Sequence, residues 1–189
     1  MNDETVTPLC VEVVALCRSD DVDVARLADW ARRALAAEGV AEASLSVRIV
    51  DDAAIHALNR RWLDHDEATD VITFPLSEPG ESRLAGEIVI SAETAARVAR
   101  ERGIEPAHEL ALYLAHGVLH LLGQDDLSTE SSRAMRCRES ELLARIGLPG
   151  DVFARGERSS PSTTPDPLLT NSSHTTSERR ERSRCSVTR

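Results

Sequence analysis

The segment from Leu110 to Leu122 most constrains the fold, because nearly every position in it is apolar. Such a segment must be buried on most of its sides, so it predicts a helix in the centre of the core. It is too short to span a bilayer, and His116 and His120 interrupt it. Pro106 suits the first turn of this helix, and Gly123 suits its end. The two histidines then lie one turn apart on one face, where both imidazoles can reach a single metal ion.

The histidine pair predicts half of a metal site rather than two core histidines satisfied by hydrogen bonds. Gly123 lets the chain turn back towards the same ion, and the first carboxylates after that turn are Asp125 and Asp126. In metzincin-type peptidases the third ligand follows the second histidine at the spacing of Asp126. We therefore expect zinc to be bound by His116, His120 and Asp126, with water in the fourth position. The carboxylate ligand also makes manganese or iron acceptable in this site.

Three other positions of the same helix bear on its chemistry. Glu109 shares the face of the histidines but lies two turns, about 10 Å, before His116, so at most it supports a ligand indirectly. Tyr113 is expected to be a core residue with a hydrogen-bonded hydroxyl. Gly117 stands where metallopeptidases of this spacing carry their general-base glutamate, which argues against peptide hydrolysis. Glycine inside a helix costs about 1 kcal/mol relative to alanine, so Gly117 predicts close approach of another element or of a substrate.

The remaining segments alternate between strand and helix patterns. Strands are predicted at "LCVEVVAL", "ASLSVRIV", "DVITFPL" and "GEIVIS", and helices at "DVDVARLADWARRALAAEG", "AAIHALNRRWL", "AETAARVARERG" and from about Thr129 to Ile146. Asp51 or Asp52 can cap the second of these helices. The pattern predicts an α+β fold, a small mixed four-stranded sheet packed against about five helices, with the metal-binding helix at its centre.

Composition separates a folded part, residues 1–155, from a tail, residues 156–189. The tail is rich in Ser, Thr, Pro and Arg and offers little to bury, so we expect it to be disordered, although "RRERSR" could also touch RNA. The net charge of −10 does not favour a general nucleic-acid binder, so any RNA contact must come from a local group of arginines. The four cysteines form no CxxC pair, and no signal sequence is recognisable, so we expect reduced thiols and a cytoplasmic protein.

Three segments in the same order resemble the YbeY family of bacterial metal-dependent endoribonucleases. They are "LNRRWLDHDEATDVITFP" at 58–75, "GEIVIS" at 86–91 and "HGVLHLLGQDD" at 116–126, and the resemblance covers about residues 9–150. It implies a single-strand-specific endoribonuclease that acts in ribosomal RNA maturation, at the 3′ end of the small-subunit rRNA, and in ribosome quality control. The partners that it implies are ribosomal RNA, the small ribosomal subunit and the Era GTPase.

The first segment departs from the family pattern at one position. The family has an aromatic residue followed by an arginine thought to serve catalysis or RNA binding, whereas Trp62 is followed here by Leu63. Arg60 lies on the same helical face and Arg61 is its neighbour, so either could offer a guanidinium to phosphate. The alternative, weighted equally, is that both are solvated surface residues.

The third segment departs at the turn. The third ligand of the family is usually histidine where this chain has Asp126, and a family tyrosine is replaced by Gln124. Asp125 could accept a proton during catalysis, although a role in capping the turn or orienting a ligand fits better.

The chemistry that follows is hydrolysis of an RNA phosphodiester bond. Zinc lowers the pKa of its bound water and polarises a phosphoryl oxygen, while a nearby arginine stabilises the developing charge. Two other functions remain open from the sequence. One is a metallopeptidase, which the missing glutamate disfavours, and the other is a ribosome assembly factor that binds ribosomal particles without turnover.

Overall fold

The computed structural model describes residues 9–19, 21–78, 81–149 and 186–187. Its elements are β1 (Cys10–Ala15), α1 (Val24–Ala37), β2 (Ala43–Val50), α2 (Asp52–Leu63), β3 (Val71–Pro75), β4 (Leu84–Ser91), α3 (Ala92–Arg102), α4 (Pro106–Leu121), α5 (Thr129–Arg145) and β5 (Ser186–Val187). The strands form one mixed sheet in the order β1-β2-β4-β3-β5. β1, β2 and β4 run parallel, whereas β3 is antiparallel to β4. The predicted α+β class, with a small mixed sheet and five helices, is confirmed.

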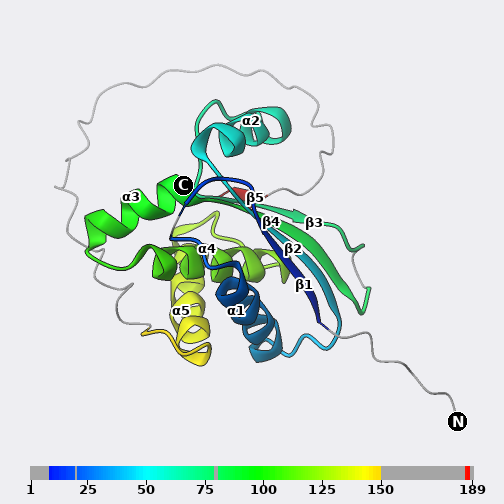
Figure 1. The fold of residues 1–189 in the computed structure, drawn as a ribbon. Helices are drawn as coiled ribbons and strands as arrows, with labels where there is room; N and C mark the ends of the chain where they lie inside the picture. The colour runs from blue at the N-terminus through cyan, green and yellow to red at the C-terminus, as the bar shows by residue number, and fades with distance from the viewer. Residues whose placement is uncertain (1–8, 20, 79–80, 150–185, 188–189) are drawn as a thin grey trace, which may run out of the picture.

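The helices form layers on the two faces of the sheet. Figure 1 shows α1, α4 and α5 grouped on one side of the sheet and α2 on the other. The alternation of buried and half-buried residues along β2 supplies one face of the larger core, which the first group covers. A second, smaller core lies under α2 and is formed by Val50, Ile55, Ile72 and Val89. Both faces of the central strands are therefore covered, as their apolar sequences require.

Helix α4 is the central helix, as predicted. It packs against α1, α3, α5 and strands β3 and β4, and Pro106 opens it at its first turn. A side chain in place of Gly117 would place its Cβ 2.9 Å from two carbons of Ile88 on β4. Gly86 on β4 is approached in the same way by Leu121 near the end of α4. The glycine inside the histidine helix thus serves close packing on the sheet, one of the two reasons that its presence suggested.

Capping interactions fix where α2 and α3 begin. Asp51, rather than Asp52, is the N-cap of α2, and its side chain accepts from the N–H of Ala54 at 2.8 Å. The carboxylate of Asp52 instead accepts from the hydroxyls of Ser91 and Thr94, at the start of α3. The first turns of the two helices are therefore joined side chain to side chain, which fixes α2 and the loop that follows it relative to α3.

The predicted disordered tail lies outside the described residues, except for two of them. Ser186 and Val187 form the short strand β5, which pairs antiparallel with Thr73 and Ile72 of β3. Among the helices of the described residues, none combines the length and the apolar character that crossing a membrane requires.

Candidate metal centre

The structure brings the three predicted ligands together. His116 and His120 are both buried on α4, and their Nε2 atoms face each other at 2.6 Å. Asp126, from the segment after α4, places Oδ1 3.8 Å from Nε2 of His120. One ligand atom from each of the three side chains lies within 4.8 Å of the others, so the group could hold one metal ion.

Both imidazoles are oriented through their other ring nitrogen. Nδ1 of His116 lies 2.5 Å from Oε1 of Glu139 on α5, and Nδ1 of His120 lies 2.9 Å from the backbone oxygen of Gln124. A carbonyl oxygen only accepts, so Nδ1 of His120 carries the proton of the neutral ring, and the carboxylate of Glu139 favours the same tautomer in His116. Each Nε2 then presents a lone pair to the other, and a cation bound by both would remove the repulsion. Partners of this kind, on the far side of the ring, are typical of metal-ligating histidines.

Electrostatics keep His120 neutral. Burial lowers its pKa, and the neighbouring His116 lowers it further. A neutral imidazole is the form that binds a metal ion, because protonation of Nε2 removes the lone pair. The site therefore presents its ligand in the required state at neutral pH.

The turn after α4 positions Asp126. Gly123 has a φ of +87°, which a side chain would disfavour, and its N–H donates to the backbone oxygen of His120 at 2.9 Å. The hydroxyl of Ser132 on α5 then donates to the backbone oxygen of Asp126 at 2.7 Å, which ties the segment back to the helices. The prediction that Gly123 ends the helix and reverses the chain is confirmed.

Asp125 has a different role from Asp126. It is exposed, and its carboxylate accepts from the N–H of Leu127 at 3.3 Å. It does not belong to the cluster formed by His116, His120 and Asp126. This geometry is that of a residue that caps a turn.

Sequence reasoning did not find two acidic residues that act on the site. Glu139 is one of many charged residues in α5, so its sequence context does not single it out. Its contact with His116 depends on the packing of α5 on α4. Asp70 precedes β3 and accepts from the hydroxyl of Thr69 at 3.0 Å and from the N–H of Val71 at 2.9 Å. Burial raises the pKa of Asp70, and the attraction of His116 opposes that shift. Its position in "ATDVITFP" gave the only available signal.

Glu109 and Tyr113 form a buried network behind the histidines. Glu109 is fully buried, and both of its carboxylate oxygens accept from Nη1 of Arg102 at 3.0 Å. The hydroxyl of Tyr113 hydrogen-bonds to Glu109, and burial raises the pKa of that phenol. Tyr113 is thus the core residue that the sequence indicated, and Glu109 links α4 to α3.

Arg60 and Arg61 lie away from this network. Both are exposed near the end of α2, and the guanidinium of Arg61 lies over the ring of Trp62, 5.2 Å from its centre. Trp62 is itself 59% exposed, and its edge meets Phe74. An arginine beside an exposed aromatic ring is one arrangement that binds single-stranded nucleic acid. This arrangement is consistent with the prediction that these arginines contact RNA.

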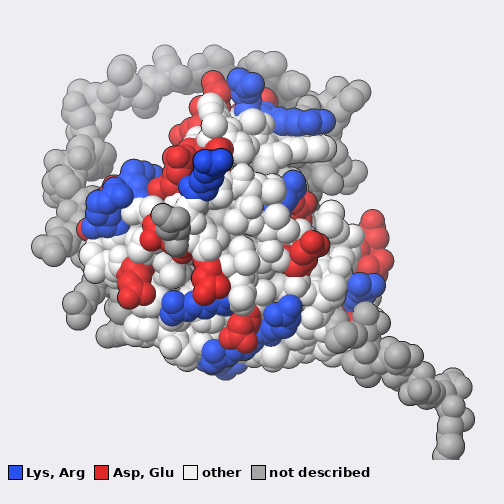
Figure 2. All heavy atoms as spheres, in the orientation of Figure 1, with Lys and Arg blue, Asp and Glu red and all other residues white. Residues whose placement is uncertain are grey.

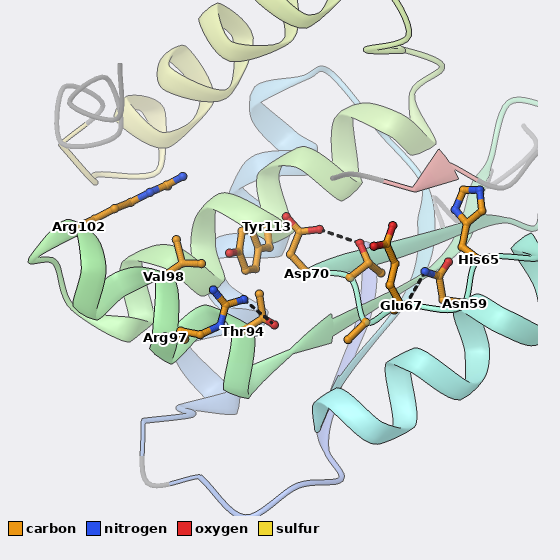
Figure 3. A pocket seen from close by; sticks show the side chains of 11 residues that line it. Asn59, His65, Glu67, Asp70, Thr94, Arg97, Val98, Arg102 and Tyr113 are labelled. Carbon is orange, nitrogen blue, oxygen red and sulfur yellow. Dashed lines mark hydrogen bonds between the residues drawn. The ribbon is translucent and has the colours of Figure 1, made fainter. Parts of the chain in front are cut away.

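A cavity of about 440 Å³ reaches α4 at Tyr113, three residues before His116, and none of the three candidate ligands lines it. Its lining comes from the end of α2, the loop before β3, α3 and α4, and consists of Asn59, His65, Glu67, Ala68, Thr69, Asp70, Thr94, Arg97, Val98, Arg102 and Tyr113. Figure 3 shows Arg97 and Arg102 on one side, His65 and Glu67 on the opposite side, and Tyr113 and Asp70 between them. Arg60 and Arg61 do not line it.

The surface agrees with the acidic composition. Figure 2 shows acidic and basic side chains interspersed over the face that it draws. RNA contact on such a face must come from a few arginines at defined places rather than from a broad basic surface.

The fold and the site define an α+β domain built around a buried HxxxH helix with a nearby carboxylate. The family description Endoribonuclease YbeY matches residues 15–147. The chain belongs to this family, which supports an endoribonuclease role.

Individual relatives agree with this assignment. The Endoribonuclease YbeY of Anaeromyxobacter dehalogenans is 48% identical over 134 residues, covering 70% of this chain and 69% of that protein. The Endoribonuclease YbeY of Moorella thermoacetica is 45% identical over 126 residues, covering 61% of this chain and 81% of that protein. The solution structure of TM1509 from Thermotoga maritima superposes with a TM-score of 0.54 at 23% identity, covering 82% of this chain and 99% of that one, which shows a shared fold.

Proposed function

We propose that this protein is a metal-dependent endoribonuclease that cleaves single-stranded RNA, with His116, His120 and Asp126 as the metal ligands. The observation that carries the proposal is the convergence of two Nε2 atoms at 2.6 Å while both Nδ1 atoms are engaged elsewhere. With both Nδ1 atoms engaged, the two Nε2 lone pairs are free to bind one cation. Membership of the endoribonuclease family supports the reaction, and the geometry of the three side chains supports the proposed dependence on metal.

The donor set fits zinc and does not exclude other divalent ions. Two imidazoles and one carboxylate with an open position form a common catalytic zinc set, and the oxygen ligand also suits manganese or iron. When bound, the ion would supply Lewis acidity towards a phosphate oxygen and lower the pKa of water in the site. Glu139 holds the ring of His116 in the ligating orientation, and the carbonyl of Gln124 does the same for His120.

The remaining residues bind the substrate or shape the site. Arg60 and Arg61 are proposed to contact the RNA backbone, in place of the family arginine that Leu63 replaces. Asp125 is proposed mainly to cap the turn that carries Asp126, with proton transfer as its less favoured role. Gly117 leaves the position of a peptidase general base without a carboxylate, so peptide hydrolysis is not proposed.

The cellular role proposed for this activity is ribosomal RNA maturation, at the 3′ end of the small-subunit rRNA, together with ribosome quality control. The support is family membership, and the proposed partners are the small ribosomal subunit, its RNA and the Era GTPase. A cytoplasmic location follows from that role.

One experiment tests the activity. The purified protein is incubated with single-stranded and double-stranded RNA of the same sequence, and its metal content is measured in parallel with that of His120→Ala. We expect about one metal ion per chain, cleavage of the single strand, and loss of metal and cleavage together in the variant. Metal retention in the folded variant would contradict the ligand assignment.

A second candidate function has one observation in its favour. Leu63 stands where the family carries its arginine, so the chain could bind ribosomal particles as an assembly factor without turnover. The same assay separates the two functions, because an assembly factor binds RNA or ribosomal subunits while the RNA stays intact.

A further inference from the structure

The cavity beside the metal centre contains two arginines that the proposed mechanism leaves without a role. Arg97 and Arg102 project from α3 and line the same side of the cavity (Figure 3). In a chain with a net charge of −10 and arginine as its only strongly basic residue, two guanidinium groups in one cavity form a defined place for an anion.

The contacts of the two arginines leave donors for a ligand. Both bonds from Arg102 to Glu109 start at Nη1, and the side chain of Arg102 is 38% exposed. Within the described part of the chain, Arg97 has two long contacts, 3.5 Å to the hydroxyl of Thr94 and 3.4 Å to Glu101. These distances are at the limit of hydrogen bonding, so the guanidinium of Arg97 can turn towards a bound anion at little cost.

The cavity reaches the helix that carries the two histidines. Tyr113, which lines it, precedes His116 on α4 by one turn, which is about 4.5 Å of helix rise. Asp70, which also lines it, directly precedes β3, and β3 packs on α4. A group in this cavity is therefore adjacent to whatever binds at the histidines.

The other side of the cavity differs in chemistry from the arginine side. Glu67 contributes a carboxylate there and Asp70 another between the two sides, and the buried amide of Asn59 fixes the loop by donating to the backbone oxygen of Glu67 at 2.8 Å. Carboxylates accept hydrogen bonds from the amino groups of bases and from ribose hydroxyls. A ligand that suits both sides carries an anionic group at one end and neutral hydrogen-bond donors at the other. A nucleotide of an RNA strand has this form, and the volume lies within the range of small-ligand sites.

We propose that this cavity is the binding subsite for the nucleotide next to the scissile bond. Its phosphate contacts Arg97 and Arg102, and donors of its base or ribose face Asp70. The inference rests on the proposed function, because the ligand is part of the RNA substrate. Arg97 and Arg102 are substrate-binding residues in this scheme, and they place the strand so that the following phosphodiester reaches the histidine ligands.

The test compares Arg97→Gln with Arg100→Gln in the full-length, metal-loaded protein. Arg100 is an exposed arginine of the same helix that does not line the cavity, so it controls for a general change of charge. Steady-state cleavage of a single-stranded oligoribonucleotide is measured over a range of salt concentrations, with metal content as a second readout.

We expect Arg97→Gln to raise KM about tenfold with a smaller change in kcat, since a charge-assisted bond to phosphate is lost. The slope of log(kcat/KM) against log salt should become shallower by about 0.7, the value for one phosphate contact on a single strand. Arg100→Gln should keep the wild-type KM and slope, and all variants should keep their metal. Equal KM and slope in Arg97→Gln and Arg100→Gln would overturn the subsite.

Arg102 requires a paired variant, because its removal alone leaves the carboxylate of Glu109 buried without a positively charged partner. Arg102→Gln combined with Glu109→Gln is therefore compared with Glu109→Gln alone. We expect the double variant to show the higher KM and the shallower salt slope, and equal values would remove Arg102 from the subsite. Cleavage by the wild type with unchanged variants refutes the subsite and leaves the proposed function standing, whereas absence of cleavage by the wild type refutes the proposed function itself.

Discussion

Glu139 should control metal affinity although it is not a ligand. Its carboxylate lies 2.5 Å from Nδ1 of His116 and is only 13% exposed, so the bond is charge-assisted and largely desolvated. Residues that orient a ligating histidine typically change metal affinity 10- to 100-fold when they are replaced. The short, buried contact places Glu139→Ala near the upper end, a loss of about 100-fold, or about 2.7 kcal/mol.

The glutamine variant separates orientation from charge. The amide oxygen of Glu139→Gln can still accept from Nδ1–H of His116, so the ring keeps its tautomer while the negative charge is lost. We therefore expect an intermediate loss, about tenfold. The measurement is a competition titration of zinc against a chromophoric chelator, with thermal unfolding followed in parallel.

The matched control for this prediction is Glu141→Ala. Glu141 lies on the same helix, is 56% exposed and pairs with Arg138, and such surface pairs contribute little. We expect it to bind zinc as the wild type does. If Glu139→Ala and Glu141→Ala have the same zinc affinity, Glu139 only joins two helices, and the orientation argument is refuted.

Three further predictions test the terminus, the exposed arginines and the third ligand. Truncation after Arg155 removes only two residues of the sheet, those of β5, so it should leave the melting temperature almost unchanged and the metal content unchanged, and a clear drop in melting temperature would show that the removed segment stabilises the fold. Arg60→Ala combined with Arg61→Ala should weaken RNA binding or cleavage at full metal content. Unchanged rates and RNA affinity would show that both are solvated surface residues. Asp126→Ala should lose metal and activity together while Asp125→Ala keeps its metal, and the opposite result in a metal analysis would make Asp125 the ligand.

The elements of the fold could be predicted because their signals are local. Apolar periodicity, capping residues and helix-ending glycines act within a few residues, and each predicted strand and helix is present at its expected place. The order β1-β2-β4-β3 could not be read in this way, since parallel pairing joins strands that are separated by a whole helix. The choice between Asp51 and Asp52 as the cap of α2 also depended on a partner outside the segment, because Ser91 and Thr94 engage Asp52.

The same distinction between local and long-range signals applies to the residues of the site. The three candidate ligands could be predicted because they lie within one helix and the turn that follows, where geometry is set by helix rise and one glycine. Glu139 and the cavity arginines come from α5 and α3, and their positions follow only from how these helices pack on α4. Gly117 was noticed in the sequence, but its role depends on tertiary packing. Its lack of a side chain was visible in the sequence, and the contact with Ile88 shows that it lets the histidine helix lie close on β4.

This packing also explains how an acidic chain can bind RNA. The binding elements that we propose are separate arginines on α2 and α3, and the acidic residues elsewhere on the surface repel strands that approach at other places. Contact with a few phosphates gives only weak affinity for RNA in general. Binding then depends on whether the strand can enter the cavity. A duplex presents its phosphates on a rigid helix and cannot place one nucleotide between α3 and the loop before β3. A preference for single strands therefore follows from the proposed subsite, independently of any base-specific contact.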